Sequence, residues 1–382
     1  MEVTDAHVHL ASPHLPNPWA DGDLNVYAGA TYPGRAVSVS RTGGDLLEAR
    51  LQSEYDDAIL NEVQLAPRLA LPNVDSCCGG GDHVDGGFRY NSDDGDNGGS
   101  EGAQTDVDGV RADTSVGATP TPVKVSRFVF VECCNEPPLD EARWALSLAD
   151  APDSRCAAVV ARIPAFDGAD AVRGFLDALR IRDKTTTASA GKDCNSTESG
   201  SLPPALKGGR VVMLGTPMPP PDHCLTCEGF DAALGVLAAE GLHWEWCCHY
   251  SALPSVATCC ARHPDMIFIL DHLGRNGGTE NDVGAWRAAL AEVARCPNVY
   301  AKTGAIEEWG VKDPAPILDT AIELFGFDRL IWESNWFVSK ACGFTVAELI
   351  TVAEAACARA CATAEDRANW FGGNAARAYR LG

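Results

Sequence analysis

Residues 3–10 read Val3-Thr4-Asp5-Ala6-His7-Val8-His9-Leu10, a short strand-like run that carries two histidines two positions apart. Side chains at positions i and i+2 of a strand point to the same face, so Asp5, His7 and His9 are expected to share one. Two imidazoles side by side at the end of a strand can hold a metal ion or a polarised carbonyl group. The run therefore predicts the first strand of the fold and one side of a candidate site.

Further strand-like runs alternate with helical periodicity along the rest of the chain. The expected strands are Val3–Leu10, Arg127–Glu132, Ala157–Ile163, Arg210–Leu214, Leu242–Cys247, Met266–Asp271, Asn298–Thr303 and Leu330–Ser334. Helical patterns include Asp45–Val63, Leu139–Leu148, Ala169–Leu179, Phe230–Ala239 and Val283–Ala294. Eight strands with intervening helices predict an α/β fold, a parallel (β/α)8 TIM barrel. An open doubly wound sheet is the alternative, but no Gly-x-Gly-x-x-Gly follows the first strand.

Two segments depart from this alternation. Residues 74–122 hold 11 glycines and ten acidic residues against two arginines, a composition that cannot bury enough apolar surface to fold. Residues 184–206 are polar and rich in serine and threonine. We therefore predict a single barrel over residues 1–382, interrupted by a disordered glycine- and aspartate-rich insertion at 74–122 and a polar loop at 184–206.

Composition restricts the partners. The 382 residues include 30 lysines and arginines against 53 acidic residues, for a net charge of −23, which argues against nucleic acid and against anionic lipid. No apolar run is long enough to span a membrane, and the first expected strand starts so close to Met1 that no leader is expected. We expect a cytoplasmic protein whose 16 cysteines are reduced and whose partner is a small molecule. The oligomeric state is not predicted.

In a barrel of this kind the active site is built at the C-terminal ends of the strands. That rule selects a set of polar residues at or just after the expected strands. They are His7, His9, Glu132, Arg210, Glu245, His249, His272, Lys302, Glu333 and Asn335.

Five motifs in order carry a family resemblance. They are D-A-H-V-H-L at 5–10, H-P-D-M-I-F-I-L-D-H-L-G at 263–274, N-V-Y-A-K-T-G at 298–304, F-G-F-D-R-L-I-W-E-S-N-W-F at 325–337 and G-N-A-A-R-A-Y-R-L at 373–381. With them the chain resembles the amidohydrolase superfamily, and more narrowly the amidohydrolase-related branch with sugar-lactone hydrolases and 2-pyrone-4,6-dicarboxylate lactonase. The resemblance implies a hydrolase that opens a lactone or similar cyclic ester by water attack on a carbonyl polarised by a histidine cluster.

The resemblance also implies roles for individual residues. His7 and His9 match paired histidines that hold a metal or the substrate carbonyl, and His272 matches a third. Asn335 stands where the family has an aspartate that binds metal and accepts the proton of the attacking water, which an amide cannot do. Glu333 lies two residues earlier, on the same face of an expected strand. We therefore expect Glu333 to accept the proton and Asn335 to orient water or substrate.

The remaining polar residues have two interpretations each. Lys302 is assigned to catalysis, as a group that steadies an oxyanion, or to a structural ion pair with Glu333 or Glu245. Arg210 is assigned to binding a substrate carboxylate, or to a salt bridge. The other expected substrate-binding residues are Glu132, Glu245 and His249.

Two groups are expected to be structural. Asp271 alternates away from His272 and is expected to tie a loop. Trp244 and Trp246 alternate with Glu245 and are expected to pack outward against helices.

The metal and the reaction are left open between alternatives. His7, His9 and His272 with a carboxylate could hold one zinc ion, or the same groups could act without metal. Cys224 and Cys227 form a single C-x-x-C, which alone does not indicate zinc. The alternative functions are a metal-dependent non-oxidative decarboxylase of a hydroxyaryl acid and a small-molecule-binding barrel without catalysis.

Overall fold

The computed structural model describes the two ends of the chain and most of its central and C-terminal parts. The described residues are 2–10, 124–180, 200–213, 228–274, 283–306, 313–336, 338–341 and 344–382. The predicted helix Asp45–Val63 and the insertion at 74–122 lie outside these residues, as do residues 184–199 of the predicted polar loop.

Eight parallel strands form one sheet in which every strand pairs with the next one along the chain. They are β1 Glu2–Val8, β2 Lys124–Val131, β3 Cys156–Arg162, β4 Leu206–Val212, β5 His243–Cys247, β6 Phe268–Leu270, β7 Val299–Lys302 and β8 Leu330–Ile331. The sheet closes through the residues that follow β8, since Trp336 bridges in parallel to Val8. The His9 amide donates to the Trp336 carbonyl at 2.7 Å. The predicted (β/α)8 barrel is confirmed.

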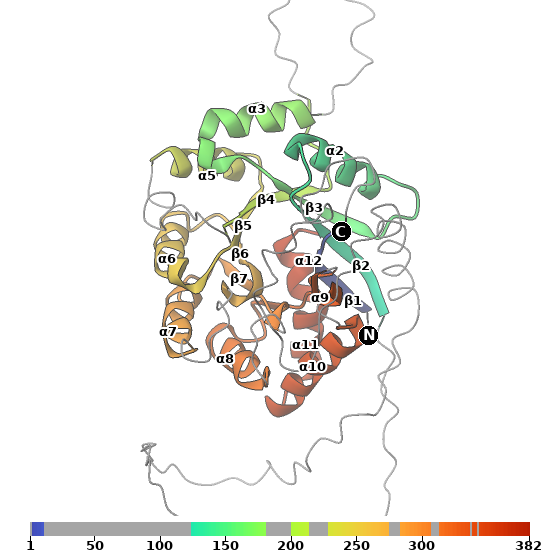
Figure 1. Ribbon diagram of the computed structural model, residues 1–382, viewed down its shortest axis with the longest axis vertical. Helices are drawn as coiled ribbons and strands as arrows, with labels where there is room; N and C mark the ends of the chain where they lie inside the picture. The colour runs from blue at the N-terminus through green and yellow to red at the C-terminus, as the bar shows by residue number, and fades with distance from the viewer. Residues whose placement is uncertain are drawn as a thin grey trace, which may run out of the picture. The chain divides into compact units, whose positions relative to one another are not determined.

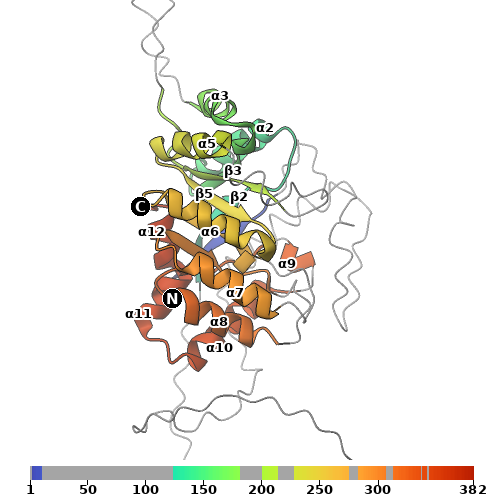
Figure 2. The same cartoon turned by 90° about the vertical axis from the view of Figure 1, so that its left-hand side faces the viewer.

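Helices connect and surround the strands (Figures 1 and 2). They are α2 Pro138–Ala149, α3 Ala169–Leu179, α5 Glu228–Ala239, α6 Leu253–Arg262, α7 Val283–Ala294, α8 Ala315–Phe325, α9 Val338–Ala341, α10 Val346–Arg359, α11 Ala364–Ala368 and α12 Asn374–Ala378. A π-helical turn, Asn369–Gly373, joins α11 to α12. Among the described helices none is both long enough and apolar enough to cross a membrane.

The fourth strand begins earlier than its sequence suggests. It starts at Leu206 rather than Arg210, so Leu206 belongs to the barrel and not to the predicted loop. Two glycines in it lower the strand propensity, but the packing requires them. A Cβ on Gly208 would lie 2.4 Å from the His243 ring, and one on Gly209 would lie 2.8 Å from Ile163. His243 and Ile163 pack directly against the backbone of this strand. Strand propensity does not reveal such packing, so the sequence placed the start of the strand too late.

The sheet separates two apolar layers. Inside, alternate residues of β2 and β3 pack with the α12 region, including Tyr379, into a buried cluster. Outside, Trp244 and Trp246 each lie 5.7 Å, between ring centroids, from Phe230 of α5. The prediction that the two tryptophans pack outward against helices is therefore confirmed.

Glu141, in the first turn of α2, holds the loop that follows β2. One carboxylate oxygen accepts hydrogen bonds from the Cys133 amide at 2.9 Å and from the Asn135 amide and side chain at 3.1 and 2.7 Å. Burial and the neighbouring Glu132 carboxylate raise the pKa of Glu141 from 4.5 to about 7. The folded protein therefore binds a proton at Glu141 that the unfolded chain has released.

We expect Glu141→Gln to remove a pH dependence of stability. Because the folded pKa is raised, the contribution of Glu141 is complete below pH 4.5 and is lost as the pH rises through about 7. The free energy of unfolding of the native protein should fall over this interval, relative to the variant, by up to about 3 kcal/mol. Denaturant unfolding at several pH values measures it. Glu136→Gln, on the same loop but half-exposed, is the control, and parallel pH profiles for native protein and Glu141→Gln would contradict the assignment.

Candidate active site

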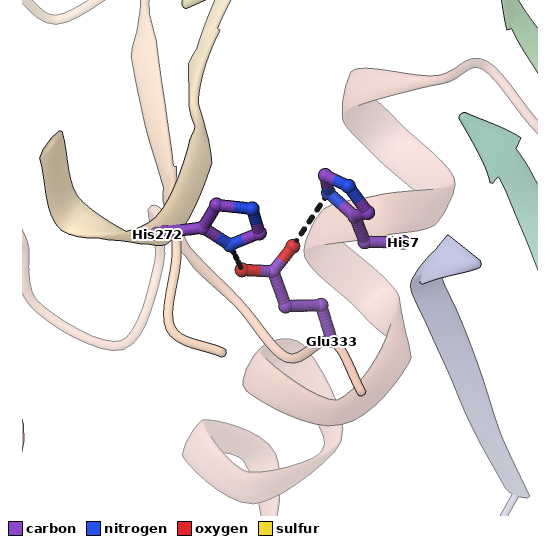
Figure 3. A group of neighbouring side chains, drawn as sticks. All are labelled: His7, His272 and Glu333. Atoms are coloured by element: carbon purple, nitrogen blue, oxygen red, sulfur yellow. Dashed lines mark hydrogen bonds and ion pairs between the residues drawn. The ribbon is translucent and has the colours of Figure 1, made fainter. Parts of the chain in front are cut away.

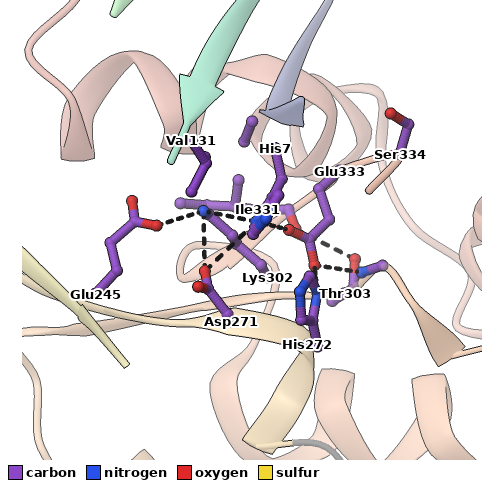
Figure 4. A network of polar contacts seen from close by, with 12 residues as sticks. His7, Val131, Glu245, Asp271, His272, Lys302, Thr303, Ile331, Glu333 and Ser334 are labelled. Atoms are coloured by element: carbon purple, nitrogen blue, oxygen red, sulfur yellow. Dashed lines mark hydrogen bonds and ion pairs between the residues drawn. The ribbon is translucent and has the colours of Figure 1, made fainter. Parts of the chain in front are cut away.

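Seven of the polar residues predicted at the strand ends meet inside the barrel together with Asp271, and each is less than a tenth exposed. They lie on seven of the strands or directly after them, and Figure 4 shows six of them, His7, Glu245, Asp271, His272, Lys302 and Glu333, pointing toward one another. The members are His7, Glu132, Arg210, Glu245, Asp271, His272, Lys302 and Glu333. We call these eight residues the barrel cluster.

Lys302 ends β7 and lies among three partners. Its ammonium is 2.7 Å from Glu245 Oε2, 2.9 Å from Asp271 Oδ1 and 3.2 Å from His7 Nδ1. Burial by itself would lower the pKa of Lys302, but the Asp271 and Glu245 carboxylates outweigh it and raise the pKa. The ammonium therefore stays charged. The ion pair with Glu245 that the sequence left open is present.

Arg210 is held in the same way by β2 and β6. Its Nε and Nη2 donate to the side-chain and main-chain oxygens of Glu132 at 3.0 and 2.9 Å, and Nη1 donates to Asp271 Oδ2 at 2.8 Å. Arg210 therefore forms a salt bridge inside the barrel, which is one of the two roles expected for it. The expected loop-tying role of Asp271 is wrong, because its carboxylate faces Arg210 and Lys302 in the cluster.

Glu333 joins two imidazoles (Figure 3). Its Oε1 is 2.7 Å from His272 Nδ1 and also accepts from the Gly304 amide at 3.0 Å, while Oε2 is 2.9 Å from His7 Nδ1. Burial would raise the pKa of Glu333, but the His272 and His7 rings outweigh it and hold the pKa far below its usual value. Glu333 is therefore an ionised carboxylate.

The backbone turns sharply where these side chains enter the barrel. β8 ends at Ile331, so Glu333 and Asn335 lie beyond the strand and not on one strand face as predicted. Asn335 and His272 adopt left-handed backbone, with φ of 49° and 53°. Such conformations cost about 1–3 kcal/mol each in non-glycine residues and gather at functional sites. Asn335 is buried, at 3% exposure.

The paired histidines are in contact, as the strand geometry predicted. His9 Nδ1 lies 3.0 Å from the Val131 carbonyl oxygen, which can only accept, so the neutral ring keeps a lone pair on Nε2. That Nε2 lies 3.0 Å from His7 Nε2. Burial and the nearby Lys302 ammonium lower the pKa of His7. Burial and the neighbouring His7 ring lower the pKa of His9. Both rings are therefore neutral near pH 7.

No placement of one proton on His7 suits all its neighbours. A proton on Nδ1 matches Glu333 and lets Nε2 accept from Arg210 Nη1, but the Lys302 ammonium, which can only donate, lies 3.2 Å from Nδ1. A proton on Nε2 matches His9, but Arg210 Nη1, which can only donate, lies 3.1 Å from that nitrogen.

Charge and donor type together fit a divalent ion. In formal charge, the four carboxylates of the barrel cluster face two permanent cations, Arg210 and Lys302, which leaves an excess of two negative charges. His7, His272 and Glu333 offer ligand atoms within 4.8 Å of one another. Nitrogen and carboxylate ligands of this kind suit zinc. A second such group, His7 with Glu245 and Asp271, surrounds the Lys302 ammonium instead.

Two predicted substrate-binding residues are engaged within the protein. Glu132 bonds Arg210 and the Cys134 amide. Glu245 Oε1 accepts from the Tyr379 hydroxyl at 2.7 Å and lies 3.1 Å from His243 Nε2. Tyr379 was missed from the sequence, since nothing in its spacing shows that a phenol after α12 reaches β5.

His249 follows the end of β5 by two residues. It begins the short turn Tyr250–Ala252, where its Nδ1 accepts from the Ser251 amide at 3.3 Å. Its ring also contacts Tyr250, 4.3 Å away between centroids. Its predicted substrate contact stays a prediction.

The comparisons with known proteins agree with this architecture. The amidohydrolase family model matches residues 203–381. The L-fucono-1,5-lactonase of Burkholderia ambifaria is 28% identical over 160 residues, 40% of this chain and 54% of that protein. That of Burkholderia multivorans is 34% identical over 144 residues, 34% of this chain and 48% of that protein. The chain thus spans about half the length of these curated relatives.

Among solved structures, an amidohydrolase from Burkholderia multivorans with bound zinc has a TM-score of 0.52 and 24% identity, over 68% of this chain and 84% of that one. At this identity the likeness shows a shared fold. The resemblance inferred from the five motifs is confirmed: over residues 203–381 the chain matches the amidohydrolase family, on a barrel that this family shares.

Proposed function

We propose that the protein is a hydrolase that opens a lactone, or a similar cyclic ester of a sugar acid or dicarboxylate, by adding water to its carbonyl carbon. The observation that carries the proposal is the His7–Glu333–His272 group at the strand ends of the barrel. The similarity to two L-fucono-1,5-lactonases supports a lactone of a sugar acid. Location in the cytoplasm and a small-molecule partner stay predictions.

The sequence led us to expect Glu333 as the proton acceptor; here we propose that His272, paired with Glu333, accepts the proton instead. Glu333 is ionised but has too low a pKa to keep a proton near neutral pH. Through the bond to His272 Nδ1 it orients the ring and stabilises an imidazolium. The water loses its proton to His272 as its oxygen bonds to the carbonyl carbon. The ring C–O bond then breaks, and the same proton passes to the leaving oxygen.

Lys302 and Arg210 act on this step through His7. Both cations are fixed by carboxylates within 3.0 Å, which keeps them from approaching a substrate directly. The Lys302 ammonium helps to keep His7 neutral, and a neutral ring can donate an N–H to a carbonyl oxygen or offer a lone pair to a metal ion. In this proposal Asn335 orients water or substrate through its amide.

His7, His272 and Glu333, with His9 beside them, are the residues that would hold a divalent ion. With an ion bound, the His272 lone pair would be a ligand and would not be available to accept the proton. Bound there, zinc would polarise the lactone carbonyl and lower the pKa of a water molecule.

Lactone opening is tested by incubating the purified protein with a panel of sugar-acid lactones and following acid release in weak buffer. We expect turnover of at least one six-membered lactone. If no lactone is turned over and hydroxybenzoates release carbon dioxide, the decarboxylase alternative is correct. If neither reaction occurs with the metal-loaded protein, the barrel binds without catalysis.

We expect Glu333→Gln to lower kcat for the lactone by about 100-fold or more, because an amide cannot stabilise the protonated His272 ring. KM should change little, since the carboxylate acts on the transition state. Glu323→Gln, which changes an exposed glutamate of α8, is the matched control. Unchanged kcat in Glu333→Gln would remove Glu333 from the mechanism.

Gly304→Ala should displace Glu333 without changing any polar group. A Cβ there would lie 2.4 Å from Glu333 Cγ and 2.8 Å from its main-chain oxygen, so the carboxylate must move. We expect kcat to fall by roughly tenfold or more and stability to fall by about 1–3 kcal/mol. Gly284→Ala in α7, where a Cβ meets nothing within 4 Å, should be neutral or stabilising. Activity of Gly304→Ala equal to that of the native protein would contradict the close fit.

Loading the protein with zinc, with and without the His272 side chain, gives an independent check on the barrel cluster. We expect elemental analysis of the protein loaded with zinc and then desalted to find zinc at this site, and His272→Asn to reduce the total by about one equivalent. Differential scanning fluorimetry should show that zinc raises the Tm of the native protein more than that of the variant. Equal zinc content in both proteins would show that His272 is no ligand.

A further inference from the structure

A second group of metal-type donors lies on the outer helices, away from the barrel cluster. Asp231 is in the first turn of α5, Cys259 is in the last turn of α6, and His263 follows α6 as its C-cap residue. One ligand atom from each lies within 4.8 Å of the other two. The two helices are neighbours in both views of the fold (Figures 1 and 2).

The Asp231 carboxylate is ionised and in place. Its Oδ1 accepts from Arg262 Nη2 at 2.8 Å and lies 3.1 Å from His263 Nε2. Burial tends to raise the pKa of Asp231, but the contacts with Arg262 and His263 outweigh it and lower the pKa. With about a third of the Asp231 side chain and a fifth of the His263 side chain exposed, solvent can reach the group.

Cys259 is the unusual member. It is completely buried, and in the described part of the chain its sulfur has no hydrogen-bond partner. Burial raises the pKa of the Cys259 thiol to about 12. A free thiolate is therefore absent at neutral pH, which argues against a Cys–His nucleophile of the kind used in thiol hydrolysis. The placement of the thiol beside an imidazole and a carboxylate is suited to metal binding, because a metal replaces the thiol proton.

We propose that Asp231, Cys259 and His263 form a zinc-type site that joins α5 to α6 on the outside of the barrel. Binding replaces the thiol proton, which leaves to solvent, and uses a lone pair of the His263 ring. The thiolate, the carboxylate and a divalent ion sum to zero charge, and solvent completes four-coordination. Arg262 can keep its contact with Asp231. The site stabilises the helix pair and takes no part in the lactone reaction.

Cobalt(II) is the probe, because a thiolate bound to cobalt gives a sulfur-to-cobalt charge-transfer band in the near ultraviolet. The barrel cluster contains no cysteine, so cobalt bound there gives no such band. Metal-free full-length protein titrated with cobalt chloride should develop the band at about one equivalent, and zinc should abolish it. Proton release on zinc binding, measured in weak buffer, should be about one per site.

Variants identify the ligands. Cys259→Ser should remove the band, and His263→Gln should weaken cobalt binding roughly tenfold or more. His263→Gln changes a partly exposed residue, so it keeps the test valid if Cys259→Ser does not fold. Glu333→Gln, Cys224→Ser and Cys361→Ser, an exposed cysteine, should all keep the band.

The proposal is overturned by any of three results. The band may fail to form in the native protein, it may survive Cys259→Ser, or it may be lost in Cys224→Ser. Each would assign Asp231 and His263 to the surface ion pair with Arg262 alone. None of these results bears on lactone hydrolysis, which the Glu333 variants test separately.

Discussion

The structure depends on the pairing of charges inside the barrel. A buried carboxylate or ammonium group is costly unless an opposite charge and hydrogen bonds compensate it. Lys302 joins β7 to β5 and β6 through Glu245 and Asp271, and Arg210 joins β4 to β2 through Glu132. Removing one member of such a buried pair costs about 3–5 kcal/mol, because its partner is left without compensation. The network therefore fixes the strand ends relative to one another as well as the imidazoles.

This pairing requires small residues and unusual backbone close to the charges. Gly304 leaves room for Glu333 and donates its amide to the carboxylate. Gly208 leaves room for His243, which contacts Glu245 and so supports the carboxylate that holds Lys302. The left-handed turns at His272 and Asn335 direct the chain after β6 and β8. Backbone conformation at these positions is thus set by the side chains that the barrel must enclose.

The sequence predicts the barrel well, because alternation of strands and helices depends on local patterns that survive folding. His7 and His9 were predicted to share a face, and their rings are in contact. Beyond the strands the two-residue period no longer holds. Glu333 and Asn335 were predicted to share a strand face, but β8 ends at Ile331, before either residue. Asp271 was expected to tie a loop, but its carboxylate pairs with Arg210 inside the barrel.

Long-range contacts account for the rest of what the sequence does not predict. Tyr379 bonds Glu245 across 134 positions of the sequence. Arg210 and Lys302 were each given two interpretations, and only the partners brought by the fold separate them. Sequence spacing shows which polar groups lie at a strand end, but the choice between substrate contact and internal ion pair depends on what the other strands place opposite.

The position of the carboxylate has a chemical consequence. In the resembled family an aspartate stands where this chain has Asn335, and here the carboxylate comes from Glu333, two residues earlier. Its contacts with both His7 and His272 make it a stable anion. A proton taken from water is therefore held by a neighbouring imidazole and not by the Glu333 carboxylate. Of the two rings, His7 is restrained by Lys302 and Arg210, whose positive charges oppose its protonation. His272 is bonded to Glu333 and is the more exposed of the two, at 6%. In the proposed mechanism His272 therefore carries the proton, and His7 remains neutral beside the substrate carbonyl or an ion.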